Sequence, residues 1–184
     1  MSAPPSELTR MIKARPLPAD PVVIEASAEE RAALAARFGL GAVQRLRAEV
    51  TLDQKARAIR ATGRLRAQIM QPCAISAEDF PVSIDAPIDL RFVEDNGRPM
   101  TEDDPGPASG AWAEIELEAD DCDEIAFTGE MFDLGEAVAQ TLGLAIDPYA
   151  EGPNADAARK AAGIVAEGEN DGPMAAMLAA LKKD

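Results

Sequence analysis

Hydrophobic and polar side chains alternate along residues 42–52 and again along residues 58–69. A repeat of two residues is typical of a β-strand that buries one side and leaves the other in solvent. We expect the two stretches to pair as an antiparallel hairpin with residues 54–55 at its tip, which places Val50 opposite Ile59. In this register the apolar sides of the two strands coincide, so the hairpin has one buried face and one wet face.

Two further stretches alternate in the same way. Residues 80–92 predict a third strand, and Pro87 in its middle indicates an edge strand or a bulge, because proline cannot donate a ladder hydrogen bond. Residues 112–119 predict a fourth strand with three glutamates on its solvent side. Between them, residues 94–110 are polar and rich in proline and glycine, and we expect a mobile loop there.

Two segments carry the start and stop signals of helices. Ser27 and Glu30 form the capping box of a short helix that Gly39 is placed to end. Asp133 is a suitable N-cap for a second helix that ends before Asp147 and has an apolar stripe at helical spacing. We expect the second helix to cover the sheet.

Together these elements predict an α+β fold: a mainly antiparallel β-sheet, either a meander or a partly closed barrel, with one main covering helix, a short N-terminal helix and a C-terminal tail helix. Residues 1–24 hold five prolines, and we expect an extended N-terminal arm laid on a single core domain of residues 25–149. Residues 150–184 are expected to form an acidic flexible linker, transiently helical at residues 157–166, that ends in the tail helix.

The tail helix is predicted from Pro173 at the first helical position and from apolar side chains at i, i+3, i+4 and i+7. These side chains are Met174, Met177, Leu178 and Leu181. A short amphipathic helix on a tether can dock into the groove of a partner protein. The alternative is that it folds back onto the chain's own sheet.

The charge is unevenly distributed along the chain. The net charge is −15, but residues 1–70 carry 12 Lys/Arg and 7 Asp/Glu, whereas residues 71–184 carry 6 and 26. This asymmetry indicates a basic surface that suits phosphate or an acidic partner, and an acidic surface that suits a basic partner. In the C-terminal loops, the acidic residues can also simply be solvated.

The predicted hairpin gathers five arginines on its wet face, partly offset by Glu49. They are Arg45, Arg47, Arg60, Arg64 and Arg66. Like charges across a ladder are destabilising, so the cluster favours an anionic counterpart, and guanidinium groups bind phosphate and carboxylate oxygens alike. No aromatic side chain lies among them, which leaves contact with an RNA backbone rather than base stacking. Alternatively, these arginines are ordinary surface residues or pair with the chain's own acidic strands.

Residue types needed for catalysis or metal binding are scarce. The sequence has no histidine, and we find no recognisable triad, phosphate-cradling glycine loop or nucleotide fingerprint, so we expect no enzymatic activity, cofactor or small-molecule substrate. The acidic run at residues 120–124 lacks the ligand spacing of a calcium loop or a zinc set, so we expect a solvated turn without metal. Cys73 and Cys122 are expected to remain unpaired thiols.

No apolar run approaches the ~18 residues of a membrane span, and no signal peptide is recognisable, so we expect a cytoplasmic protein without membrane contact.

Several short motifs follow one another in a recognisable order. They are Pro72-Cys73 after the second strand, Asp79-Phe80-Pro81 before the third, Phe132-Asp133-Leu134 at a helix start, and GPMAAMLAALKK at residues 172–183. This order, over roughly residues 20–184, resembles that of the YceD family, the large ribosomal RNA subunit accumulation proteins. In that family a Cys-x-x-Cys motif ends the central strand. Here Met70 stands at the first cysteine position, so we carry over no metal site to Cys73.

The resemblance implies a role in accumulation or processing of large-subunit ribosomal RNA, without an established catalytic activity. We therefore expect a non-enzymatic ribosome-biogenesis factor whose basic hairpin face contacts RNA phosphates. The alternative is an acidic protein-binding adaptor that docks a basic ribosomal protein or an RNA-processing enzyme.

Overall fold

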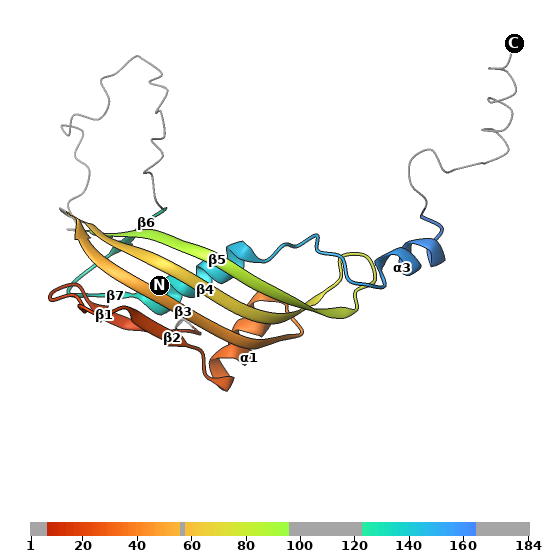
Figure 1. Cartoon of the computed structure of the whole chain (residues 1–184), viewed down its shortest axis with the longest axis horizontal. Coiled ribbons are helices and arrows are strands. Elements are labelled where there is room, and N and C mark those ends of the chain that lie inside the picture. The colour runs from red at the N-terminus through yellow and green to blue at the C-terminus, as the bar shows by residue number, and fades with distance from the viewer. Residues whose placement is uncertain (1–6, 56–57, 96–122, 165–184) are drawn as a thin grey trace, which may run out of the picture.

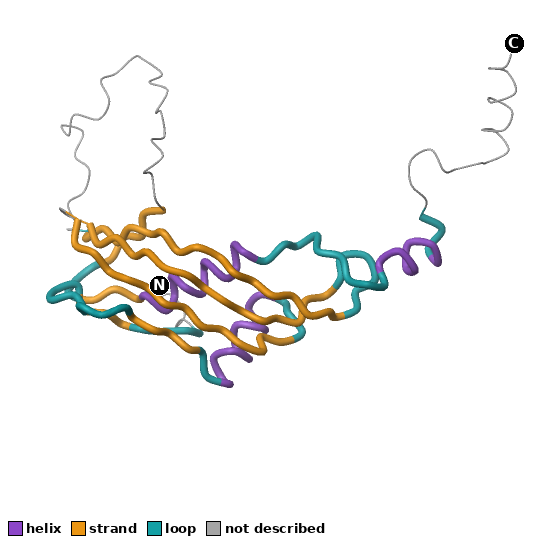
Figure 2. The backbone as a smooth tube through the Cα atoms, in the orientation of Figure 1, coloured by secondary structure: helices purple, strands orange, loops and turns teal. Residues whose placement is uncertain are grey.

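The computed structural model of the chain describes residues 7–55, 58–95 and 123–164 (Figures 1 and 2). The elements, in chain order, are β1 (Met11–Lys13), β2 (Val22–Glu25), α1 (Ala28–Phe38), β3 (Ala42–Lys55), β4 (Ala58–Pro72), β5 (Asp79–Glu94), β6 (Asp123–Phe127), β7 (Met131–Asp133), α2 (Leu134–Ala145) and α3 (Ala155–Ala161). The predicted strand at 112–119, nearly all of the predicted loop at 94–110, and the tail helix with its four apolar side chains lie outside the described residues. Glu94 itself belongs to β5.

The fold is α+β and is built on an open sheet of five strands in the order β2-β3-β4-β5-β6. The first three pairings are antiparallel, whereas β6 runs parallel to β5. The partly closed barrel considered from the sequence is therefore wrong for this sheet, and the meander holds for β3, β4 and β5. Strand β6 pairs only with Leu90–Glu94, so Pro87 lies where β5 has no described neighbour on that side, as proline requires.

The hairpin of β3 and β4 is longer than the sequence predicts, and the predicted register is wrong. Val50 lies opposite Gly63 rather than Ile59, and the pairing continues to Lys55 opposite Ala58, which moves the tip to residues 56–57. The partner of Val50 moves by an even number of positions, so the apolar sides still coincide. The predicted tip contains no Asn-Gly or similar pair to specify a tight turn, and extending the ladder adds further hydrogen bonds.

One face of the sheet is apolar and is packed against α1 and α2, which both lie behind it in Figure 1. Leu34 of α1 and Val138 of α2 are completely buried in the same cluster as Leu65 of β4. Phe92 of β5 stacks on Phe132, with ring centroids 4.3 Å apart. We call this the inner face; α1 and α2 both pack on it.

The helix caps form as the sequence predicts. Ser27 Oγ accepts a hydrogen bond from the Glu30 backbone N–H at 3.2 Å, and a Glu30 carboxylate oxygen accepts from the Ser27 N–H at 2.7 Å. Gly39 ends α1 with a φ of 65°, the left-handed conformation that favours glycine. Asp133 caps α2 and also accepts from the backbone N–H of Arg10 at 2.8 Å. This N-cap therefore also fixes the N-terminal arm.

The two ends of the described chain both contact the core. The N-terminal arm supplies β1, which pairs with β7, and β2, which is the edge strand beside β3. Residues 150–164, expected as a flexible linker, contain α3 and touch the turn between β4 and β5. Ala74 donates its N–H to the Ala150 oxygen at 3.0 Å, and Asn154 donates to Glu78 at 2.6 Å.

A candidate nucleic-acid interface on the outer face

The polar side chains of β3, β4 and β5 form the face opposite α1 and α2, which we call the outer face. Because the three strands are in register, these side chains lie in rows across the sheet. From one end to the other, the rows are Arg45, Gln68 and Ser83; Arg47, Arg66 and Asp85; Glu49, Arg64 and Pro87; Thr51, Thr62 and Asp89; and Asp53, Arg60 and Arg91. All five arginines predicted from the sequence are therefore brought together on one face.

Most of these arginines have carboxylate partners from neighbouring strands. Arg60 binds Asp89 through two parallel hydrogen bonds, 2.9 Å from Nε and 2.8 Å from Nη2. Arg64 Nε donates to Asp85 Oδ1 at 2.6 Å, and Arg66 Nε lies 3.7 Å from Asp85 Oδ2. Toward the β2 edge of the sheet, Arg47 pairs with Glu25 of β2. The pairing with the chain's own acidic strands, considered above as an alternative, occurs for these four arginines.

The pairs at Asp85 are exposed and leave part of each guanidinium group open. The side chains of Arg64, Arg66 and Asp85 are 59%, 72% and 49% exposed. The hydrogen bond from Arg64 lowers the pKa of the Asp85 carboxyl, so the carboxyl is ionised at neutral pH. Ion pairs this exposed typically contribute about 0–1 kcal/mol, so a multivalent anion can compete with Asp85 for the two arginines.

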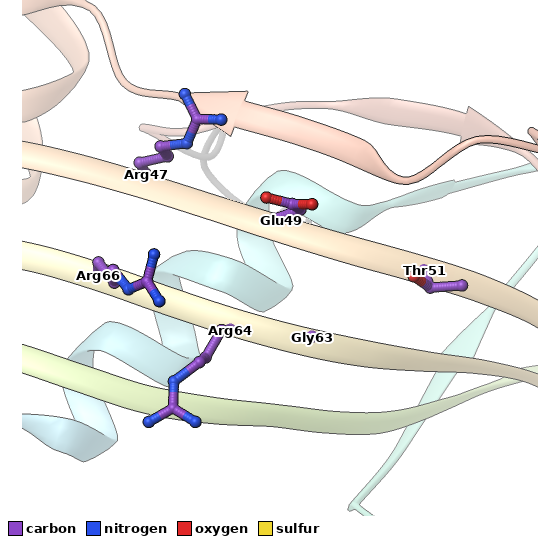
Figure 3. Close-up of a pocket in the computed structure, with 6 residues that line it drawn as sticks. All are labelled: Arg47, Glu49, Thr51, Gly63, Arg64 and Arg66. Carbon is purple, nitrogen blue, oxygen red and sulfur yellow. The ribbon is translucent and has the colours of Figure 1, made fainter.

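Two adjoining hollows lie on the outer face. The larger, about 550 Å³, is lined by residues that include Arg45, Arg47, Arg66 and Gln68. The smaller, about 310 Å³, is lined by Arg47, Glu49, Thr51, Gly63, Arg64 and Arg66. Figure 3 shows the smaller hollow, with Arg47 directed toward β2 and Arg64 directed toward β5. The hollows share Arg47, Glu49 and Arg66, so they form one continuous depression with a basic centre.

The partners of the arginines cannot be identified from the sequence alone. Asp85 and Asp89 occupy the polar positions of the third alternating stretch, but their place beside Arg64 and Arg60 depends on a register that the sequence did not determine. Glu25 is the first residue of the predicted core domain, directly after the predicted arm, and its contact with Arg47 depends on β2 joining the sheet edge.

Cys73 lies on the other side of the sheet, at the turn that follows β4. Its side chain is buried, and its sulfur accepts hydrogen bonds from the N–H groups of Ile75 and Ser76, both at 3.4 Å. Hydrogen bonds from the Ser76 side chain and backbone, followed by that from the Gly152 backbone, lower the pKa of the thiol to about 7. The thiol is packed against the segment that leads into α3.

Among the described residues no group of three metal-ligating side chains occurs, and no helix is long and apolar enough to cross a membrane.

A comparison with protein families gives one match. The family model described as "Large ribosomal RNA subunit accumulation protein YceD" matches residues 61–183, about two thirds of the chain. The matched part begins in β4, so it includes Arg64 and Arg66, whereas Arg45 and Arg47 precede it. Searches of curated proteins and of solved structures returned no match. The chain belongs to the YceD family of large ribosomal RNA subunit accumulation proteins.

Proposed function

We propose that this protein promotes the accumulation or processing of large-subunit ribosomal RNA by binding RNA phosphates through the outer-face arginines, without catalysing a reaction. The observation that carries the proposal is the gathering of Arg45, Arg47, Arg60, Arg64 and Arg66 on one face of an otherwise acidic protein. Guanidinium groups form charge-assisted hydrogen bonds with phosphate oxygens, and several such contacts along one face add up.

The composition of the outer face supports backbone contact without base reading. The rows across β3, β4 and β5 contain arginines, carboxylates, hydroxyl groups and one proline, and no aromatic side chain on which a base could stack. The carboxylates of Asp85 and Asp89 reduce the local positive charge. The protein is therefore expected to bind RNA weakly per contact, to depend on several contacts at once and to lose affinity steeply as salt is added.

The proposal is tested with a variant in which Arg45, Arg64 and Arg66 are replaced by Glu. Binding to a large-subunit ribosomal RNA fragment is measured at several salt concentrations. We expect a strong loss of affinity and a salt slope reduced by about 2, because each phosphate contact with a single strand contributes about 0.7. An unchanged affinity and slope would contradict the proposal.

A matched control separates the outer face from the net charge of the protein. It carries the same change in charge at three exposed positions on β1, on the segment that follows it and on α3, namely Lys13→Glu, Arg15→Glu and Lys160→Glu. We expect the control to bind RNA nearly as well as the wild type. If both variants lose binding equally, the effect comes from net charge and the face has no special role.

A second candidate function is the acidic adaptor, which docks a basic ribosomal protein or an RNA-processing enzyme. The observation that favours it is the charge of residues 71–184, which carry 6 Lys/Arg and 26 Asp/Glu. In this case the predicted tail side chains Met174, Met177, Leu178 and Leu181 form the docking element. Deleting residues 172–184 should abolish co-purification of the partner while leaving the thermal transition nearly unchanged, and persistence of the partner would exclude the tail.

The two candidates are distinguished by a pull-down from cell extract with and without ribonuclease. Partners that are retained through RNA disappear after ribonuclease treatment, as the first candidate predicts. A protein partner that remains after treatment supports the adaptor.

A further inference from the structure

One row of the outer face consists of three side chains with hydrogen-bond donors and without a partner among the described residues. The register pairs Arg45 with Gln68 and Gln68 with Ser83, so a guanidinium, an amide and a hydroxyl group lie side by side across β3, β4 and β5. None of these three side chains makes a hydrogen bond or an ion pair within the described residues. All three residues are exposed, so the donors are available to a ligand.

The neighbouring rows differ from this one because they contain their own carboxylates. In the next row Arg66 faces Asp85, and at the far end of the face Arg60 is held by two hydrogen bonds to Asp89. A guanidinium group with both donors of one edge occupied must break those bonds before it can bind a phosphate through that edge. Arg45 has no such bond to any described residue, so binding through it breaks no interaction seen in the described part of the chain.

The row also borders the larger hollow of the outer face. This depression of about 550 Å³ is lined by Arg45, Gln68 and Ser83, and the neighbouring rows add Arg47 and Arg66 together with the carboxylates of Glu49 and Asp85. A phosphate group carries several acceptor oxygens, and the row supplies three kinds of donor from three adjacent strands. Strand neighbours lie about 4.8 Å apart and Gln68 stands on the middle strand, so a phosphate group above Gln68 would lie about one strand spacing from Arg45 on one side and from Ser83 on the other.

We propose that Arg45, Gln68 and Ser83 form a phosphate-binding subsite within the outer face, with Arg66 at its border. This inference rests on the proposed function and names the place on the face where a phosphate group is held by specific hydrogen bonds. Gln68 and Ser83 are uncharged, so they add affinity and orientation without displacing counterions, and their contribution does not depend on salt.

The test uses two variants that leave the charge of the protein unchanged. The first replaces both neutral donors, Gln68→Ala with Ser83→Ala. The control replaces a neutral hydroxyl residue elsewhere on the same face, Thr62→Ala, since Thr62 lies on β4 and lines neither hollow. All three positions are on the polar side of the sheet, and circular dichroism verifies that both variants keep the wild-type fold.

Binding is measured by fluorescence anisotropy with short single-stranded RNAs of large-subunit ribosomal sequence, at several salt concentrations. We expect the Gln68/Ser83 variant to bind about 5- to 20-fold more weakly with an unchanged salt slope, because hydrogen bonds from neutral donors to a charged acceptor are lost. The control should bind as the wild type does. Each RNA is prepared with a 5′-phosphate and with a 5′-hydroxyl group: a loss with both assigns the subsite to a backbone phosphate, and a loss only with the former assigns it to the terminal phosphate.

The subsite is refuted if the Gln68/Ser83 variant binds like the wild type, or if the control is weakened to the same extent. This failure is distinguishable from failure of the proposed function. When the triple arginine variant loses binding and the Gln68/Ser83 variant does not, the outer face binds RNA without the subsite. When the wild-type protein does not bind ribosomal RNA at all, both proposals are wrong.

Discussion

The inner and outer faces of the sheet take alternate residues from the same three strands, β3, β4 and β5. On the inner face Leu65 is fully buried and Phe92 is 1% exposed. On the outer face the side chains of Arg60 and Arg66 are 35% and 72% exposed. Neighbouring residues in the sequence therefore occupy surroundings as different as a hydrocarbon core and open solvent.

The inner face stabilises the fold, whereas the outer face is available for binding. Burying one large apolar side chain contributes about 1.5–3 kcal/mol, whereas an exposed ion pair contributes about 0–1 kcal/mol. The inner face therefore holds the fold together. The outer face can be changed with little effect on stability, which leaves its side chains available for a ligand.

The largest expected effect comes from removing a large side chain from the inner face. Phe92→Ala should lower the free energy of unfolding by about 3–5 kcal/mol, because Phe92 stacks on Phe132 and its loss leaves a cavity. Urea denaturation measures the change. Asp89→Asn on the opposite side of the same strand is the matched control, with an expected loss below about 1 kcal/mol. Equal losses in the two variants would remove the distinction between the faces.

A smaller effect is expected at Gly63, which lies opposite Val50 in the hairpin. A Cβ atom on Gly63 would lie 2.0 Å from the backbone oxygen of Glu49, so β3 and β4 would have to separate. Gly63→Ala should cost about 2–3 kcal/mol, the upper range for overpacking. Thermal denaturation checks it, with Thr62→Ala as the neighbouring control. A neutral Gly63→Ala variant would mean that the strands separate without cost and that this glycine does not fix the register.

Part of the fold could be predicted from the sequence, and part could not. Period-two alternation was enough to identify β3, β4 and β5 and to assign the apolar side of each, because a strand buries every second residue whatever its register. The register itself does not follow from this alternation, because any shift by an even number of residues keeps the apolar sides of the two strands together. The parallel β6 was missed for a related reason, since its place beside β5 is set by tertiary packing.

The candidate site was predictable to the same extent as the fold. Alternation placed all five arginines on one face correctly, even with the wrong register. Their individual surroundings were not predictable, because the carboxylates of Asp85, Asp89 and Glu25 come from strands whose positions the sequence did not determine. The donor row of Arg45, Gln68 and Ser83 could not be recognised either, since it exists only once three strands are in register.

Arg10 and Glu30 form an ion pair away from the outer face that is more enclosed than the pairs of Arg64 and Arg66 with Asp85. Arg10 binds Glu30 at 2.6 Å with side chains 33% and 21% exposed, and Glu30 also completes the cap of α1. The hydrogen bond from Arg10, opposed in part by burial, lowers the pKa of Glu30 from 4.5 to about 2. Glu30→Gln should therefore cost about 1–2 kcal/mol at neutral pH, more than the loss of an exposed pair.

The stability that the Arg10–Glu30 pair contributes is lost at acid pH. The pKa of Glu30 is lower in the folded state than in the unfolded state, so its contribution is fully present above pH 4.5 and is lost as the pH falls toward about 2. The free energy of unfolding of wild type and Glu30→Gln, measured across this range, should converge at the acid end. If the difference between the two proteins stays constant with pH, the Glu30 side chain stabilises the fold through its shape and hydrogen bonds rather than its charge.

The smallest effect on stability is expected for Asp85→Asn on the outer face, because its ion pairs are exposed to solvent. Asp85 is the carboxylate shared by Arg64 and Arg66, so its neutralisation removes the internal competitor of an RNA phosphate. We expect RNA affinity to rise about two- to fivefold, since a repulsive charge within a few ångströms of the phosphate is worth up to about 1 kcal/mol in water. Anisotropy titration and urea denaturation of the same variant measure both quantities. A fall in RNA affinity would show instead that Asp85 orients the two guanidinium groups for the ligand, because only then does losing a negative charge weaken the binding of a polyanion.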